Sequence, residues 1–196
     1  MPEEMSLRDH ARGAVRDEIA RKAWRLLADQ GFEATTIDQI AEAAGMSRRT
    51  FFRYFASKDE LVLTRLVESG DRIAEALRAR PADEPAWPAL RAAFQHIVEL
   101  QEAHAEVARP LQVMLRAEPA LRATRQERRT LWLELLAPLV AERLPPRPGR
   151  TGPDIRALAL TGSALACFEA AQGAWAENPG VPLASLLDEA MESVGG

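Results

Sequence analysis

The sequence has little cysteine and no long hydrophobic run. Its single cysteine, Cys167, excludes an internal disulfide framework and fits a reducing compartment. The longest apolar stretch, Leu158 to Phe168, is about half of the ~20 residues that a membrane-spanning helix needs. The N-terminal segment MPEEMSLRDHARG lacks the apolar core of a secretion signal. We therefore expect a cytoplasmic protein with no membrane partner.

Strand signals are absent as well. Val, Ile, Tyr and Thr are sparse relative to Ala, Leu, Arg and Glu, and short-period alternation of apolar and polar residues is missing. Hydrophobic residues make up 47% of the 196 positions, which is enough for the core of one or two small domains. The apolar spacing instead predicts an all-α protein with about nine helices.

Neither half of the chain has a basic surplus. The net charge is −4, and residues 1–60 carry ten Lys or Arg against eleven Asp or Glu, while the remainder carries 15 against 18. Any binding to nucleic acid would therefore depend on local clustering of charge. The run from Ser47 to Lys58 provides such a cluster, because it holds four basic side chains and no acidic one.

This basic run belongs to the segment Thr36–Lys58, TIDQIAEAAGMSRRTFFRYFASK, which predicts two short helices joined by a tight turn. Gly45 supplies the left-handed residue that such a turn needs, and Ser47 caps the second helix. Phe51 and Phe55 are four residues apart and should face the first helix, which leaves arginines on the outer face. We interpret the segment as a helix-turn-helix that reads DNA. A helical hairpin with a few surface arginines is the alternative.

The helical patterns divide the chain into two domains, residues 1–60 with a flexible arm at 1–13, and residues 61–196. The first is expected to be a three-helix DNA-binding domain, and the second a helical ligand-binding and dimerisation domain. The helices are predicted at about 14–30, 36–44, 47–55, 57–80, 87–103, 105–116, 119–144, 154–177 and 183–194, and Pro138 should kink or divide the seventh.

The eighth predicted helix is unusual because its middle, LALTGSALACFEAAQGAW, is apolar or small nearly all round. A helix without a polar face is normally buried on all sides, and in a small domain this points to a partner chain. We predict that helices eight and nine of two chains form a four-helix homodimer interface. The alternative is that both helices cover the monomer's own core.

The second domain also offers side chains for a small-molecule pocket. The candidate lining residues are Phe94, Ile97, Gln101, Leu111, Met114, Trp132, Leu136 and Phe168, with Trp87 beside them. Polar groups to orient a ligand are His96, Gln101, His104, Arg109, Gln112 and Gln172. If the ligand is an acyl-CoA, Arg109 or Arg128 would meet a phosphate. Apolar residues of this kind are also typical of a plain core.

Patterns for catalysis are missing. The sequence contains neither a Gly-rich phosphate loop nor a nucleophile elbow. His96, Glu99 and His104 share one predicted helix, but no second cluster adds ligands and the H-E-x-x-H spacing is absent. We expect no catalytic residues, no metal site and no cofactor.

An N-terminal helix followed by GFEATTIDQIAEAAGMSRRTFFRYFASKDEL resembles the DNA-binding domain of the TetR family of bacterial transcriptional regulators, over about residues 14–63. The turn, the capping serine, the aromatic run and the Ser-Lys opening of the next helix all align. The resemblance implies an all-helical homodimer whose third helix enters the major groove of double-stranded operator DNA. It also implies a C-terminal domain that binds a small ligand, which releases the DNA.

The resemblance also implies roles for individual residues. Arg48, Arg49 and Arg53 stand where family members contact base edges. Phosphate contacts are implied for Thr36, Ser47, Thr50, Tyr54 and Lys58. Many members have a small residue at the position of Arg49, so an arginine there favours guanine-containing half-sites, since Arg pairs bidentately with guanine.

The C-terminal half is similar to a TetR subgroup named for a mycofactocin-associated regulator, through LRAEPALRA, the Ala-rich helix ending in Trp175, and LLDEAM. This similarity implies acyl-CoA-like ligands. The expected function is a homodimeric repressor that a small apolar or acyl-CoA-like inducer releases from its operator. The alternatives are a ligand-independent regulator or activator of the same fold, or a helical protein-binding module that does not bind DNA.

Overall fold

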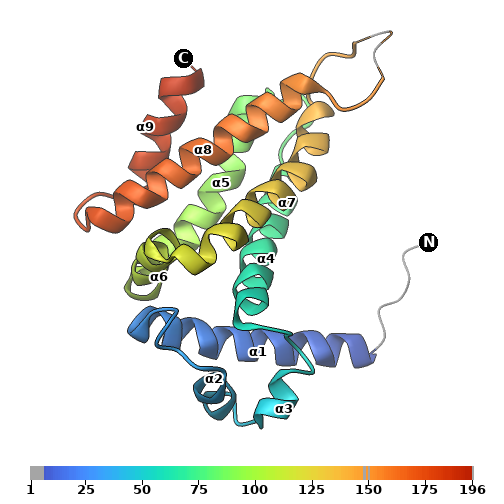
Figure 1. Ribbon diagram of the computed structural model, residues 1–196. Helices are drawn as coiled ribbons and strands as arrows, with labels where there is room; N and C mark the ends of the chain where they lie inside the picture. The colour runs from blue at the N-terminus through green and yellow to red at the C-terminus, as the bar shows by residue number, and fades with distance from the viewer. Residues whose placement is uncertain (1–6, 148, 150, 196) are drawn as a thin grey trace.

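The computed structural model describes residues 7–147, 149 and 151–195. Over these residues the chain forms nine α-helices, one short 3₁₀ helix and no strand, which confirms the all-α prediction (Figure 1). The helices are α1 (Leu7–Gln30), α2 (Ile37–Ala43), α3 (Arg48–Phe51), α4 (Lys58–Arg78), α5 (Ala86–Ala103), α6 (Ala105–Ala117), the 3₁₀ helix η1 (Pro119–Leu121), α7 (Arg122–Ala141), α8 (Ile155–Glu177) and α9 (Leu183–Gly195).

Helices α1, α2 and α3 form a small head, and α4 rises from it into the larger helical body made by α5 to α9 (Figure 1). The apolar cluster of the head includes Phe51, Phe55 and Ile40, but it also takes in Leu111 and Leu115 of α6. Helix α6 packs directly against α1. The core of the head therefore continues past residue 60, because α6 belongs to it in space.

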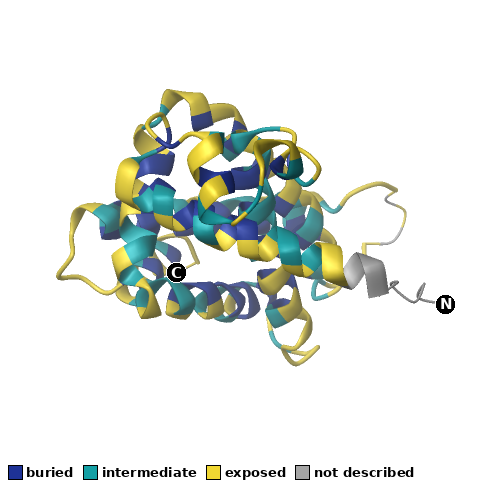
Figure 2. Ribbon diagram, turned by 90° about the horizontal axis from the view of Figure 1, so that it is seen from below, coloured by how far each residue is buried: buried dark blue, intermediate teal, exposed yellow. Residues whose placement is uncertain are grey.

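The second apolar cluster fills the helical body. Its members come from α4, α5, α7, α8 and α9, and they include the aromatic residues Phe94, Trp132, Phe168 and Trp175, all buried. Seen from below, buried residues (dark blue) turn inward between the helices and exposed residues (yellow) lie on their outer faces (Figure 2). The body thus has a core of its own, and α4 is the element that runs between this core and that of the head.

The first helix begins earlier than the sequence pattern predicted. Helix α1 starts at Leu7, so a flexible arm over residues 1–13 is wrong for residues 7–13, while residues 1–6 lie outside the described part of the chain. Leu, Arg and Ala in this stretch are good helix formers. Gly13 alone, at about 1 kcal/mol relative to Ala, does not stop the helix.

The two prolines of the seventh predicted helix have different effects. Pro119 begins the separate 3₁₀ helix η1, and α7 starts only at Arg122. Pro138 lies inside α7 without dividing it, and the helix continues to Ala141. Since Pro138 stands in the last turn, little helix follows it that could be redirected.

Helix α7 is held against α4 by a close contact between Trp132 and Gly70. The indole Nε1 of Trp132 donates to the carbonyl oxygen of Leu66 at 3.1 Å. A Cβ atom on Gly70 would lie 2.5 Å from that nitrogen, so only glycine leaves room for the indole. This contact ties the helix that leaves the head to the middle of the body.

Candidate nucleic-acid interface and ligand pockets

The turn between α2 and α3 is built as the sequence predicted. Thr36 and Gln39 form a capping box, in which the Gln39 backbone N–H donates to Thr36 Oγ1 at 3.2 Å and the Thr36 N–H donates to Gln39 Oε1 at 2.7 Å. Gly45 adopts a φ of +69°, a left-handed conformation that favours glycine. Ser47 Oγ accepts from the backbone N–H of Thr50 at 3.1 Å. These local bonds fix the direction in which α3 leaves the turn.

Helix α3 is short and has one buried side. It spans four residues, and a hydrogen-bonded turn follows it, so the basic run is only partly regular helix. Phe51 and Phe55 are 0% and 1% exposed, with ring centroids 5.7 Å apart, which fixes the inner face against the head core. Arg48, Arg49 and Arg53 are exposed. The structure therefore leaves all three predicted base-reading arginines exposed on the outer surface of the head.

Two residues of this surface were not identified from the sequence. Phe52 is 43% exposed, and its ring centroid lies 5.6 Å from the guanidinium carbon of Arg48. Asp38, in the first turn of α2, forms an ion pair with Arg48 at 2.9 Å. Among the described residues, Arg49 and Arg53 form no ion pair, so they carry the unneutralised charge of the surface.

Of the five predicted phosphate-contacting residues, Thr36 and Ser47 are exposed, and Thr50 and Tyr54 are half-buried. Lys58 differs, because its ammonium turns inward. Its Nζ donates to the carbonyl oxygens of Phe32 and Thr35, the latter at 2.8 Å, and lies 4.0 Å from the Phe32 ring centroid. A cation in the first turn of a helix lies at the positive end of the helix dipole, which is unfavourable. The partial negative charge of these carbonyl oxygens offsets that effect for Lys58. One of its three donors is left for another acceptor.

We expect Lys58→Met to destabilise the head as well as weaken DNA binding. The substitution removes two charge-assisted hydrogen bonds between α4 and the α1–α2 loop. A hydrogen bond to a charged group typically contributes about 1.5–3 kcal/mol to the free energy of unfolding. Calorimetry should show a lower Tm, with Arg49→Met, whose side chain is exposed, as the matched control that leaves Tm unchanged. Loss of DNA affinity at an unchanged Tm would mean that Lys58 acts only on phosphate.

The predicted ligand-binding residues do not lie in one place in the structure. Phe94 and Phe168 have ring centroids 5.0 Å apart, and Trp132 stacks on Phe168 at 6.2 Å, so these rings fill the body core with Leu136. Met114 belongs to the core of the head. Ring-on-ring contact makes these residues packing partners of one another in this structure.

Ile97, Gln101 and Leu111 line a pocket of about 430 Å³ between the head and the body, although Ile97 also belongs to the body core and Leu111 to the head core. We call it the inter-domain pocket; its walls come from α4, α5, α6 and, on the head side, from Arg21, Trp24 and Arg25 of α1. Its lining includes His104 and Gln112, which were predicted as orienting groups. Trp24 is 9% exposed, and its Nε1 is buried without a hydrogen-bond partner among the described residues. The head thus contributes Trp24 to this wall.

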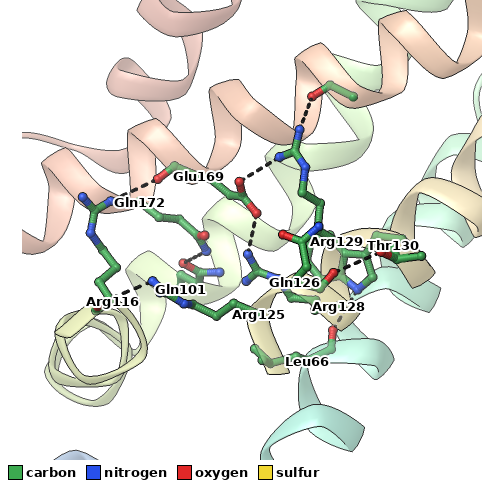
Figure 3. Close-up of polar contacts among 12 residues, drawn as sticks. Leu66, Gln101, Arg116, Arg125, Gln126, Arg128, Arg129, Thr130, Glu169 and Gln172 are labelled. Carbon is green, nitrogen blue, oxygen red and sulfur yellow. Dashed lines mark hydrogen bonds and ion pairs between the residues drawn. The ribbon is translucent and has the colours of Figure 1, made fainter. Parts of the chain in front are cut away.

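A second pocket, of about 420 Å³, lies between α6, α7 and α8. Five arginines, Arg116, Arg122, Arg125, Arg128 and Arg129, line it together with Glu169, and we call it the basic pocket. Figure 3 labels all of these residues except Arg122. Of these, only Arg128 was a candidate from the sequence. The available signal was the spacing of the arginines in LRATRQERRT, since positions i, i+3, i+6 and i+7 share one face of a helix.

Arg109 was predicted as a possible phosphate ligand, and the structure gives it a different position. Its guanidinium donates to the carbonyl oxygens of Trp175, Asn178 and Pro179, the last at 3.1 Å, and lies 4.1 Å from the Trp175 ring centroid. These carbonyls mark the C-terminal end of α8, where a cation is favourable. Arg109 therefore holds the turn between α8 and α9.

Comparison with known sequences identifies the family of the chain. The family described as bacterial regulatory proteins, tetR family, matches residues 19–64, and the MftR C-terminal domain matches residues 84–196. The chain belongs to the TetR family. Members of this family are DNA-binding transcriptional regulators and not enzymes.

Individual relatives agree with this assignment. Over 97 residues, half of the chain, it is 40% identical to the transcriptional regulator TcmR of Streptomyces glaucescens, of which the match covers 43%. It is 29% identical to the mycofactocin biosynthesis transcriptional regulator MftR of Mycobacterium tuberculosis, over 94% of this chain and 91% of MftR. The crystal structure of FadR from Bacillus subtilis in complex with stearoyl-CoA has the same fold, with a TM-score of 0.64 at 20% identity over 90% of this chain and 95% of FadR.

Two further properties of the TetR-family chain come from its described residues. None of their helices is both long enough and apolar enough to cross a membrane. Within the same part of the chain, no three His, Cys, Asp or Glu side chains are grouped closely enough to hold a metal ion.

Proposed function

We propose that the chain is a homodimeric repressor that holds its operator through α3 and is released by a small apolar or acyl-CoA-like ligand. The observation that carries the proposal is the outer surface of the head. There Arg48, Arg49 and Arg53 are exposed beside a capped turn, while Phe51 and Phe55 fix the other side. A short helix with exposed guanidiniums suits insertion into a major groove.

The proposed roles on DNA follow the accessibility of each side chain. Arg49 and Arg53 read guanines, since neither has a carboxylate partner among the described residues. Arg48 exchanges its exposed ion pair with Asp38 for DNA, at a cost of about 0–1 kcal/mol typical of surface pairs. Phe52 is placed to contact a thymine methyl group. Thr36, Ser47, Thr50 and Tyr54 contact phosphates, with the third donor of Lys58 as an addition.

The proposed dimer interface lies on the outward face of α8 and α9. The inward face of α8 packs against α5, α6, α7 and α9 of its own chain, so the helix does serve the monomer core. Its outward face still exposes small or apolar residues. The outward residues are Ile155, Ala159, Ala166 and Ala170 on α8, with Leu186, Ala190 and Val194 half-buried or exposed on α9. Small side chains permit close approach of a second helix pair, which supports a four-helix interface.

The inter-domain pocket supports release by a ligand. One wall belongs to α1 of the head and the others to α4, α5 and α6, so a ligand that enlarges the pocket pushes the head away from the body. Helix α4 would transmit the same movement, because Trp132 ties it to α7. A ligand acts in this way only if it binds the released state more tightly than the operator-bound state. The fold that the chain shares with FadR of Bacillus subtilis, which was solved in complex with stearoyl-CoA, supports an acyl-CoA-like ligand as the inducer.

The test uses a pool of genomic DNA fragments at two salt concentrations, followed by acyl-CoAs of graded chain length. We expect affinity to fall steeply with salt, because each phosphate contact releases counterions. We also expect one range of chain lengths to free the DNA. A flat salt response would favour a protein-binding module instead, and retention of DNA with every acyl-CoA would remove this ligand class.

A further inference from the structure

The basic pocket holds more positive charge than the protein itself neutralises. Five arginines line it, and Glu169 is the acidic residue among its lining. The Glu169 carboxylate is shared, since Arg128 Nη2 donates to one oxygen and Arg129 Nη1 to the other, both at 2.8 Å. Arg116, Arg122 and Arg125 form no ion pair with any described residue. The pocket lining therefore contains one carboxylate and five guanidinium groups.

Burial makes this imbalance costly. Arg128 is only 5% exposed, and its Nε is buried without a hydrogen-bond partner in the described structure. The Nε of Arg125 is buried and unpartnered in the same way. Burial lowers the pKa of Arg128, against the opposing effect of Glu169, and the charges of Arg125 and Arg129 lower it further. Buried guanidiniums with vacant donors need an acceptor, and charged acceptors satisfy them best.

The pocket is also shaped to admit the guanidiniums. A Cβ atom on Gly173 would lie 1.7 Å from Arg116 Nη1, so the glycine on α8 leaves the space that Arg116 occupies. Arg125 Nη1 donates to the backbone carbonyl oxygen of Arg116 at 3.4 Å, and Arg116 Nη1 donates to the backbone carbonyl oxygen of Glu169 at 3.5 Å. Arginines of α6 and α7 thus converge on α8 from two directions (Figure 3).

We infer that the basic pocket is a binding site for a phosphate-bearing group of a small molecule, with Arg125 and Arg128 as its inner donors and Arg116 and Arg122 at its rim. Arginine matches phosphate geometry because its planar fork donates two parallel hydrogen bonds. Helices α6, α7 and α8 stand in the body, away from α3, so the group is not operator DNA (Figure 1).

The position of the pocket connects it with the proposed inducer. Gln112 and Leu115 line both the basic pocket and the inter-domain pocket. Gln172 of the basic pocket donates to Gln101 of the inter-domain pocket at 3.1 Å, so a side-chain bond joins the two linings (Figure 3). A ligand with a phosphate head and an apolar tail would reach both pockets. This connection rests on the proposed function, whereas the anion site stands on the arginines alone.

Titration calorimetry of the full-length protein at constant ionic strength tests the site, with inorganic phosphate, pyrophosphate and coenzyme A as probes. We expect pyrophosphate and coenzyme A to bind, and Arg125→Gln to weaken both by about tenfold or more, because a charge-assisted donor is lost. Arg78→Gln, at an exposed arginine of α4 outside the pocket, is the matched control and should change neither affinity. Stronger binding of pyrophosphate than of phosphate identifies a diphosphate, and equal binding identifies a monoester.

Thermal unfolding without a ligand distinguishes a ligand-binding role of these side chains from a structural role. We expect Arg125→Gln to raise Tm because it relieves repulsion on Arg128, and Glu169→Gln to lower Tm while tightening pyrophosphate binding. Absence of pyrophosphate binding, or equal binding by the native protein, Arg125→Gln and Arg78→Gln, overturns the inference. Operator release by acyl-CoA is scored separately. If Arg125→Gln loses pyrophosphate binding but keeps full release, the connection between the anion site and the inducer fails, while the anion site and the inducer proposal both stand. If pyrophosphate binds but no acyl-CoA releases DNA, the inducer proposal fails and the anion site stands.

Discussion

Replacing both Arg49 and Arg53 with alanine is expected to lower operator affinity at least about 30-fold, without a change in Tm. A bidentate pair of arginine with guanine contributes about 1–3 kcal/mol of discrimination, and well-separated base contacts add. Both side chains are exposed and form no ion pair among the described residues, so their removal leaves nothing buried unpaired. Fluorescence anisotropy with operator and random DNA, at one fixed salt concentration, measures the effect.

The comparison between operator DNA and random DNA is the decisive part of this experiment. If the two arginines read bases, the double variant loses affinity for the operator and retains most of its weak affinity for random DNA. The control is Arg48→Ala, which should show a smaller loss because Arg48 already pairs with Asp38. Equal losses on both DNAs would assign Arg49 and Arg53 to phosphates.

The DNA-binding head was predictable because its signals are local. Capping by Thr36 and Ser47, the left-handed Gly45 and the burial of Phe51 and Phe55 each depend on residues a few positions apart. The interactions of Lys58 were not local in this sense. Its carbonyl partners Phe32 and Thr35 precede it by 26 and 23 residues, so only the folded chain brings them together.

The ligand pockets were harder to predict for the same reason. Apolar periodicity selects residues that face inward, and it does not separate those that fill a core, such as Phe94 and Phe168, from those that line a pocket, such as Ile97. Trp24 belongs to the head core and also lines the inter-domain pocket. Its place in the inter-domain pocket depends on the packing of α1 against α6, which no local pattern encodes.

Ala166→Glu is expected to dissociate the proposed dimer and, through it, to abolish tight operator binding. Ala166 is exposed on the outward face of α8, so the monomer should fold normally with a carboxylate there. A two-fold interface is self-complementary, and each substitution therefore places a charge in both halves of the contact. Unpaired like charges in an interface cost several kcal/mol, which corresponds to at least about a 100-fold weaker dimer.

Analytical ultracentrifugation over a concentration series measures the dimer, and anisotropy with a full operator and with a single half-site measures the consequence for DNA. A dimer holds two half-sites about 34 Å apart, so loss of the dimer should weaken binding to the full operator while leaving half-site binding unchanged. Ala82→Glu, which adds the same charge in the exposed loop between α4 and α5, is the control and should remain dimeric. A variant at Ala166 that stays dimeric would show that the outward face of α8 lies outside the interface, because a buried carboxylate at that position is not tolerated without a partner.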